Sequence, residues 1–151
     1  MTRWPLPDPM REALKLAQEA EQAGEVPVGA VVTRNGAIIG RGRNVTRVRH
    51  DPTGHAEIVA IREAARLSGS ERLTDCEIWV TLEPCAMCAG AISHARLAKL
   101  YYAAQDPKGG AVAHGARVFD HPQCLHRPDV YPGLGEAEAG LLLRSFFAAR
   151  R

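Results

Sequence analysis

The sequence predicts an α/β fold: a three-layer α/β/α sandwich around a mixed central sheet. Runs of β-branched and apolar residues that suit strands alternate with longer runs that suit helices. Two strand-like runs are joined by Asn35-Gly36, a dipeptide typical of tight antiparallel hairpins. Two others are separated by one short helix, which implies parallel pairing with a right-handed crossover. A sheet with both connections is mixed, and helices are needed to cover its two faces.

The first half of the chain predicts two helices with a hairpin between them. Apolar residues recur at three- and four-residue spacing in both helices, and the first helix ends at Gly24. An arginine-rich loop separates the hairpin from the second helix. The expected elements are a helix over residues 9–23, strands over 27–33 and 37–39, and a helix over 54–67.

The second half predicts a strand, a helix, another strand and a closing amphipathic helix. Pro84 suits the first position of the middle helix because its missing N–H would have no partner there. Residues 111–133 contain several Pro and His and are expected to be a loop with at most a short helical turn. The expected elements are a strand over 77–82, a helix from 86 towards 97, a strand over 99–104 and a helix over 136–150.

Length and composition bound the class of protein. The chain has 151 residues, of which 46% are hydrophobic and 24% charged, and it contains no linker or repeat, so we expect one domain over residues 1–151. No apolar run reaches membrane-spanning length, and the first residues lack the apolar core of a secretion signal. Four cysteines, two of them close together, suit metal chemistry in a reducing compartment. These features predict a cytoplasmic protein with no membrane partner.

Positive charge is concentrated in one segment. The formal net charge of +2 and the pI of about 8.5 say little about nucleic acid by themselves. Residues 34–50, however, contain five arginines and no acidic residue. Such a segment could contact phosphates, and the alternative is a solvated loop that keeps the protein in solution.

The most informative motif is the pair Cys85 and Cys88. Both follow a predicted strand and lie in the predicted opening turn of a helix, where the unpaired N–H groups favour thiolate over thiol. On their own the two cysteines could be a redox pair or half of a structural metal site. His55 offers a third ligand, and three protein ligands leave a fourth position open for water, as in catalytic zinc sites. Glu57, in the same helical turn as His55, is the natural proton carrier for that water.

These residues match the zinc deaminase signature, His-x-Glu with Pro-Cys-x-x-Cys. The chain resembles the cytidine deaminase superfamily and, within it, the bacterial tRNA-specific adenosine deaminases. The similarity spans nearly the whole chain. Beyond the zinc motif, it rests on Glu25-Val-Pro-Val-Gly-Ala30, Asn44, Asp106-Pro-Lys108 and the closing Phe146-Phe147 with Arg151.

The resemblance implies a cytidine deaminase-like fold and one Zn²⁺ per subunit, bound by His55, Cys85 and Cys88. It also implies hydrolytic deamination of adenosine to inosine at the wobble position of a tRNA anticodon, with Glu57 as the proton shuttle for zinc hydroxide.

Further expectations follow from the resemblance for substrate and partners. The implied partners are the anticodon stem-loop of an arginine tRNA and a second subunit in a homodimer. The implied substrate contacts are Val28 and Asn44 in the base and ribose pocket, and Asp106, Lys108, Phe147 and Arg151 on flanking nucleotides.

Other interpretations remain open for several of these residues. Asn44 and the segment 106–108 could serve only as turns, and Phe146 and Phe147 suit the core, so that at most one of them would face RNA. For the whole chain, the alternatives are a deaminase of free bases or nucleosides such as cytosine, guanine or cytidine, and a non-catalytic zinc-stabilised binding module. The zinc motif alone does not separate the two kinds of deaminase, because that choice depends on the pocket and the last helix.

Overall fold

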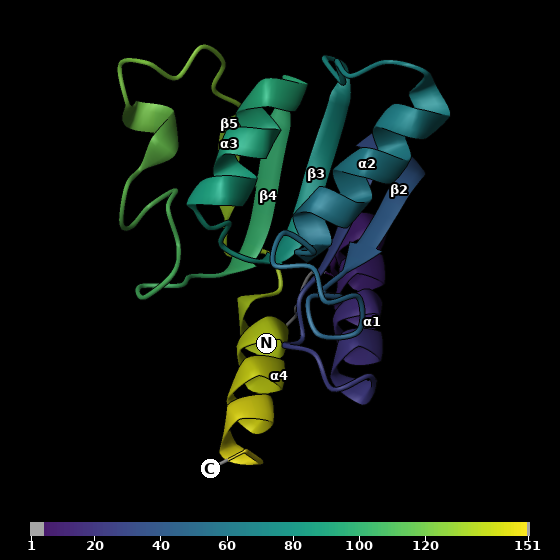
Figure 1. Cartoon of the computed structure of the whole chain (residues 1–151), viewed down its shortest axis with the longest axis vertical. Coiled ribbons are helices and arrows are strands. Elements are labelled where there is room, and N and C mark those ends of the chain that lie inside the picture. The colour runs from purple at the N-terminus through teal and green to yellow at the C-terminus, as the bar shows by residue number, and fades with distance from the viewer. Residues whose placement is uncertain (1–4, 151) are drawn as a thin grey trace.

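The computed structural model of the chain describes residues 5–150, which form a five-stranded sheet with helices on both faces (Figure 1). Among these residues, no helix is both long enough and apolar enough to cross a membrane. In chain order the elements are α1 Asp8–Gln22, β1 Gly29–Arg34, β2 Ala37–Arg43, α2 Ala56–Ser68, β3 Cys76–Leu82, α3 Ala86–Ala95, β4 Lys99–Ala104, the 3-10 helix η1 Val118–Asp120, β5 Asp129–Pro132 and α4 Glu136–Ala148.

The sheet is mixed, with strand order β2-β1-β3-β4-β5. Strand β1 is antiparallel to both of its neighbours, β2 and β3. Strands β3, β4 and β5 are parallel. The hairpin at Asn35-Gly36 and the parallel crossover through α3 are therefore confirmed.

Two apolar clusters fill the space on either side of the sheet. One lies beneath α2 and α3 and includes Ala60, Ile92 and Leu100. The other lies beneath α1 and α4 and includes Met10 and Trp79. Figure 1 shows α2 and α3 side by side over one face of the sheet. The expected three-layer sandwich is confirmed.

Glycines in the strands allow the helices to pack very close to the sheet. A Cβ added at Gly42 would lie 2.2 Å from the carbonyl oxygen of Ala56, and one at Gly40 would lie 2.4 Å from that of Ala60. Real Cβ atoms do not approach oxygen so closely, so only glycine fits at these positions of β2. This contact fixes the height of the first turns of α2 above the sheet.

The prediction that an arginine-rich loop begins directly after the strand over 37–39 is only partly right. Strand β2 continues to Arg43, and Gly40 and Gly42 take its inward positions, so the strand lacks the usual apolar alternation. Arg41 forms an ion pair with Glu12 of α1 and Arg43 with Glu19, at 3.1 and 3.7 Å. Only the exposed arginines after β2, at positions 47 and 49, remain in a loop.

Three further boundaries differ from the sequence prediction. Strand β5 lies inside the segment expected to be loop; it is an edge strand of only four residues, three of them exposed, which is too short to show a periodicity. Helix α2 starts at Ala56, later than Gly54. Pro84 does not occupy the first helical position, because Cys85 is the N-cap of α3.

We expect Gly42→Ala to lower the free energy of unfolding by about 2–3 kcal/mol, because the new methyl group would push α2 away from the sheet. The matched control is Gly90→Ala in α3, where a Cβ meets nothing within 4 Å. That change should stabilise the helix by up to about 1 kcal/mol, because alanine suits helices better. Urea unfolding of the two variants checks both. A Gly42→Ala protein as stable as the parent would contradict the close packing.

Candidate active site

The candidate site lies where the N-termini of α2 and α3 come together. His55 is the N-cap of α2, Cys85 is the N-cap of α3, and Cys88 lies in the first turn of α3. Helix N-termini carry unpaired N–H groups and partial positive charge, which favours negative charge on nearby groups. The sequence prediction that both ligand segments begin helices is confirmed.

Asn44 fixes the start of α2 from outside the helix. Its Oδ1 accepts a hydrogen bond from the Ala56 N–H at 3.0 Å, and its Nδ2 donates to the Val26 carbonyl at 3.1 Å. The His55 side chain makes no capping hydrogen bond, so Asn44 satisfies an N–H that the helix leaves unpaired. The imidazole of His55 is thereby left for another role.

The three expected ligands lie in one group. His55 Nδ1 is 3.5 Å from Cys85 Sγ and 3.6 Å from Cys88 Sγ. All three potential ligand atoms lie within 4.8 Å of one another. A tetrahedral ion with ordinary Zn–N and Zn–S bonds places the nitrogen about 3.6 Å from each sulfur. The side chains of His55, Cys85 and Cys88 therefore fit zinc, with Nδ1 as the nitrogen ligand.

The two thiols have opposite protonation preferences. The hydrogen bond from Cys88 to Cys85 is the main cause that lowers the pKa of Cys85 to about 4. The same interaction, with burial, raises the pKa of Cys88. The hydrogen bond with Cys85 also raises the pKa of His55. One thiolate is thus available near neutral pH, and a divalent cation would have to displace the proton on Cys88.

Glu57 lies beside these ligands and is only 4% exposed. Burial is the main cause that raises the pKa of its carboxyl to about 7. The carboxyl also interacts with the Cys88 thiol, which places it at the ligand group. A carboxyl that takes up and releases a proton near neutral pH, beside a possible metal ion, is suited to general acid–base chemistry.

The two residues expected in the base and ribose pocket occupy different environments. Val28 is 5% exposed and packs in the cluster beneath α2 and α3. Asn44 is half-buried, and both ends of its amide bond the backbone as described above. The structure therefore shows a structural task for Asn44, and one of its Nδ2 hydrogens remains for a ligand.

The residues expected on flanking nucleotides lie in two segments. Asp106 Oδ1 accepts hydrogen bonds from the N–H groups of Lys108 and Gly109, so this carboxylate shapes its own turn, while the Lys108 side chain is exposed. In α4, Phe146 is buried and Phe147 is 51% exposed, so only Phe147 is available for an outside contact. Arg151 lies outside the described residues.

Two buried carboxylates were not singled out from the sequence. Glu25 is 1% exposed and accepts hydrogen bonds from Thr46 Oγ1 and from the N–H groups of Arg47 and Val48. Glu83 is 2% exposed and binds the segment 106–114. Both glutamates lie within the sequence runs that carry the family resemblance, but a glutamate gives no sign in the sequence that it is buried.

The pKa of Glu83 shows how strongly its partners favour the charged form. Burial alone would raise the pKa of the carboxyl. Hydrogen bonds from the Asp106 N–H, the His114 ring and the N–H groups of Val112 and Ala113 outweigh burial and hold the pKa below its usual value. Glu83 is therefore a carboxylate at neutral pH.

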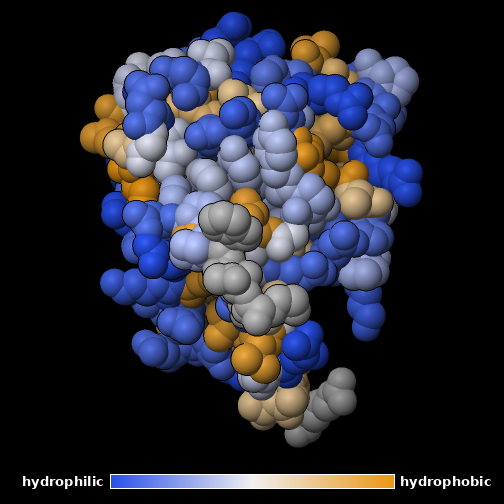
Figure 2. Space-filling model, turned by 180° about the vertical axis from the view of Figure 1, so that it is seen from behind, coloured by the Kyte–Doolittle hydropathy of each residue, from blue (hydrophilic) through white to orange (hydrophobic). Residues whose placement is uncertain are grey.

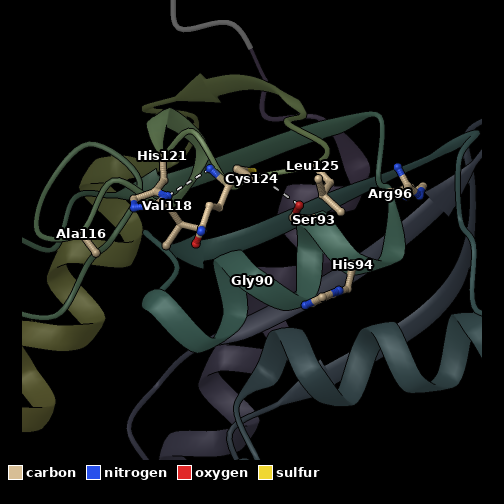
Figure 3. A pocket seen from close by; sticks show the side chains of 10 residues that line it. Gly90, Ser93, His94, Arg96, Ala116, Val118, His121, Cys124 and Leu125 are labelled. Atoms are coloured by element: carbon tan, nitrogen blue, oxygen red, sulfur yellow. Dashed lines mark hydrogen bonds between the residues drawn. The ribbon is translucent and has the colours of Figure 1, made fainter.

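A cavity of about 340 Å³ lies elsewhere, between α3 and the segment that follows β4. Figure 3 shows Ser93, His94 and His121 among the side chains around it. Ser93 Oγ lies 3.5 Å from Cys124 Sγ at its edge. None of the expected ligands lines this cavity, so it is separate from the candidate active site.

This fold, with three clustered nitrogen and sulfur ligands and a buried glutamate beside them, defines a zinc-binding deaminase. The family model for the cytidine and deoxycytidylate deaminase zinc-binding region matches residues 7–104. The chain therefore belongs to this family.

Individual relatives narrow the assignment. A tRNA-specific adenosine deaminase of Agrobacterium fabrum is 53% identical over 142 residues, which cover 94% of this chain and 93% of the relative. A solved structure from studies of A-to-I editing by tRNA:A34 deaminases superposes with a TM-score of 0.88 at 52% identity, covering 89% of this chain and 98% of that one. A guanine deaminase structure from Bacillus subtilis gives 0.64 at 36% identity, covering 94% and 91%. Within the deaminases, the chain belongs with the tRNA-specific adenosine deaminases.

We expect the purified protein to contain about one zinc ion per chain and Cys88→Ala to lose most of it, because two ligands bind a divalent ion far more weakly than three. The control is Cys124→Ala, which removes a half-buried thiol outside the ligand group and should keep the metal. Elemental analysis after dialysis measures both. Full zinc content in Cys88→Ala would exclude this ligand set.

Proposed function

We propose that this chain deaminates adenosine to inosine at the wobble position of a tRNA anticodon, in a single domain over residues 1–151. The observation that carries the proposal is the group of His55, Cys85 and Cys88, with the buried carboxyl of Glu57 against Cys88. The similarity to tRNA-specific adenosine deaminases and to a tRNA:A34 deaminase structure supports the choice of substrate.

The side chains of His55, Cys85 and Cys88 would hold zinc, which would supply a water molecule acidic enough to lose a proton near neutral pH. Glu57 would accept that proton, because its own pKa of about 7 allows it to bind and release protons at that pH. Glu57 would then pass the proton to ring nitrogen 1 of adenine as the water oxygen bonds to carbon 6. Glu57 would next take the proton of the new C6 hydroxyl and deliver it to the amino group, so that the C6–N bond breaks, the C6 carbonyl of inosine forms and ammonia leaves.

The base must leave its stack before it can react, which an anticodon loop allows at low free-energy cost. Val28 and Asn44 would line the pocket that receives the base and ribose. Asn44 would do so with the Nδ2 hydrogen that is not bonded to Val26. Because Asn44 also caps α2, substrate contact and ligand placement would share one side chain.

The flanking nucleotides would lie along the turn at Asp106 and the last helix. Lys108 offers an exposed positive charge to phosphate, and Phe147 an exposed ring to a base. Figure 2 shows that apolar residues gather at the lower end of the molecule, where α4 projects in Figure 1. Leu141 and Phe147 of α4 are 60% and 51% exposed. Arg151, which lies outside the described residues, is proposed as a further contact to the flanking nucleotides.

The finer partner assignments also form part of the proposal. A second subunit would cover part of the exposed apolar surface, which is a reason to expect a homodimer. An arginine tRNA is the substrate that the family resemblance implies. The setting would be the cytoplasm, where tRNA is found and where thiol ligands stay reduced.

The alternative is a deaminase of free bases such as guanine on the same scaffold. The guanine deaminase of Bacillus subtilis shares the fold, but at a lower TM-score and lower identity than the tRNA:A34 deaminase. A zinc site cannot separate the two activities, because each needs the same activated water. The substrate must be tested directly.

We expect an anticodon stem-loop with adenosine at the wobble position to be converted to the inosine form, whereas free guanine, cytosine and cytidine give no ammonia at comparable enzyme concentration. Loop nucleotides can enter a pocket and also contact Lys108 and α4, whereas a free base can use only the pocket. Nucleoside analysis of the RNA and an ammonia assay measure the two reactions. Rapid free-base turnover without editing of the stem-loop would favour the alternative.

We expect Glu57→Gln to keep its zinc and to lose turnover on the stem-loop by about 10²–10⁴-fold, because the amide cannot shuttle protons. Zinc content should stay at the parent value, because Glu57 is not one of the three grouped ligands. Single-turnover kinetics with saturating enzyme separates chemistry from binding. Near-normal turnover in this variant would assign the proton transfer to another group.

A further inference from the structure

The Glu83 carboxylate is completely enclosed by the segment that carries Asp106 and Lys108. Its side chain has no exposed surface. Oε1 accepts the Asp106 N–H at 3.1 Å and lies 2.8 Å from His114 Nδ1. Oε2 lies 3.0–3.2 Å from three successive N–H groups, those of residues 112–114. One side chain thus meets both ends of the segment 106–114.

The backbone of the segment 106–114 packs directly against the Glu83 carboxylate. A Cβ added at Gly110 would lie 2.5 Å from Glu83 Cδ and Oε2, so only glycine can pass the carboxylate at this distance. The Ala111 N–H donates to the Pro84 carbonyl at 2.8 Å, which ties the middle of the segment to the residue between Glu83 and Cys85. The segment is therefore bound at its start, its middle and its end to residues directly before the ligand Cys85.

These hydrogen bonds need a negative acceptor. Four backbone N–H groups and one imidazole converge on two oxygens, and residues 112–114 have no regular secondary structure to satisfy their N–H groups in another way. Hydrogen bonds to a buried charge are among the strongest in proteins, and loss of the charge would leave several donors unsatisfied. The carboxylate thus determines the path of the chain between 106 and 114.

We propose that Glu83 is the positioning residue of the RNA-contacting segment: it holds residues 106–114 in the shape that presents Lys108 to the substrate and ties that shape to the Cys85 turn. The proposal rests on the proposed function in one respect only, namely that Lys108 contacts RNA. The side-chain hydrogen bonds described for Glu83 all go to residues 106 and 112–114, so Glu83 acts through the segment.

A double-mutant cycle between Glu83→Gln and Lys108→Ala tests this positioning. Glutamine keeps the size of the side chain but turns one acceptor into a donor, so part of the segment must move. We expect KM for the stem-loop to rise about tenfold and the rate on bound substrate to change less than about threefold, with zinc unchanged. Lys108→Ala should raise KM about fivefold in the parent, yet less than about twofold in the Glu83→Gln background.

The matched control is Glu25→Gln, which alters another buried carboxylate that binds backbone N–H groups, in the loop at 46–48. Lys108→Ala should keep its full effect in that background, because Glu25 does not contact the segment 106–114. A full Lys108 effect in the Glu83→Gln background would overturn the proposal. Zinc loss or slowed chemistry in Glu83→Gln at unchanged KM would do the same.

Two further measurements keep the test decisive. If Glu83→Gln does not fold, His114→Ala removes only the half-buried imidazole partner, and it should show a smaller rise in KM with the same coupling to Lys108→Ala. Hydrogen exchange at the amides of 112–114 reports on the segment without any RNA, and it should accelerate in Glu83→Gln but not in Glu25→Gln. Unchanged exchange in Glu83→Gln would overturn the positioning role. Faster exchange in Glu83→Gln, together with a parent protein that does not edit the stem-loop, would overturn the proposed function alone.

Discussion

The candidate site depends on the meeting of two helix N-termini at a fixed separation. The distances from His55 Nδ1 to the two sulfurs suit a tetrahedral ion only because α2 and α3 both start at the same edge of the sheet. Close contact between Gly42 and Ala56 fixes the height of α2, and the Asn44 amide fixes where the helix begins. Neither of these contacts involves a metal ligand, yet a shift of about 1 Å in either would move His55 out of the position that suits the ion.

Much of this could be predicted from the sequence because the informative residues are close neighbours along the chain. Cys85 and Cys88 are three residues apart, so helical spacing places them on one face, and His55 and Glu57 are identified by the His-x-Glu part of the signature. The strands with apolar patterns and the Asn35-Gly36 hairpin were predictable for the same local reason. The end of β2 was not, because Gly40 and Gly42 serve the packing of α2 and leave no apolar pattern.

Long-range partners account for the remaining differences. Glu83 and the N–H groups of 112–114 are about thirty residues apart in sequence, and no local pattern connects an acidic residue after a strand with an irregular segment. Strand β5 was missed because it exists through pairing with β4 rather than through its own apolar pattern. Arg41 and Arg43 are part of the arginine-rich segment that could contact phosphates, but both form ion pairs with carboxylates of α1, Arg41 with Glu12 and Arg43 with Glu19.

The chemistry and the recognition of substrate are therefore built in different ways. The ligands and Glu57 sit on the first turns of packed helices, where the backbone is regular and side chains have little freedom. The segment 106–114, which is proposed to present Lys108 to RNA, is irregular, and Glu83 holds it from within. A segment held by one buried carboxylate can change its exposed residues without disturbing the donors that fix its path. A single zinc-binding scaffold can therefore accommodate deaminases for substrates as different as guanine and a folded tRNA, as the two similar structures indicate.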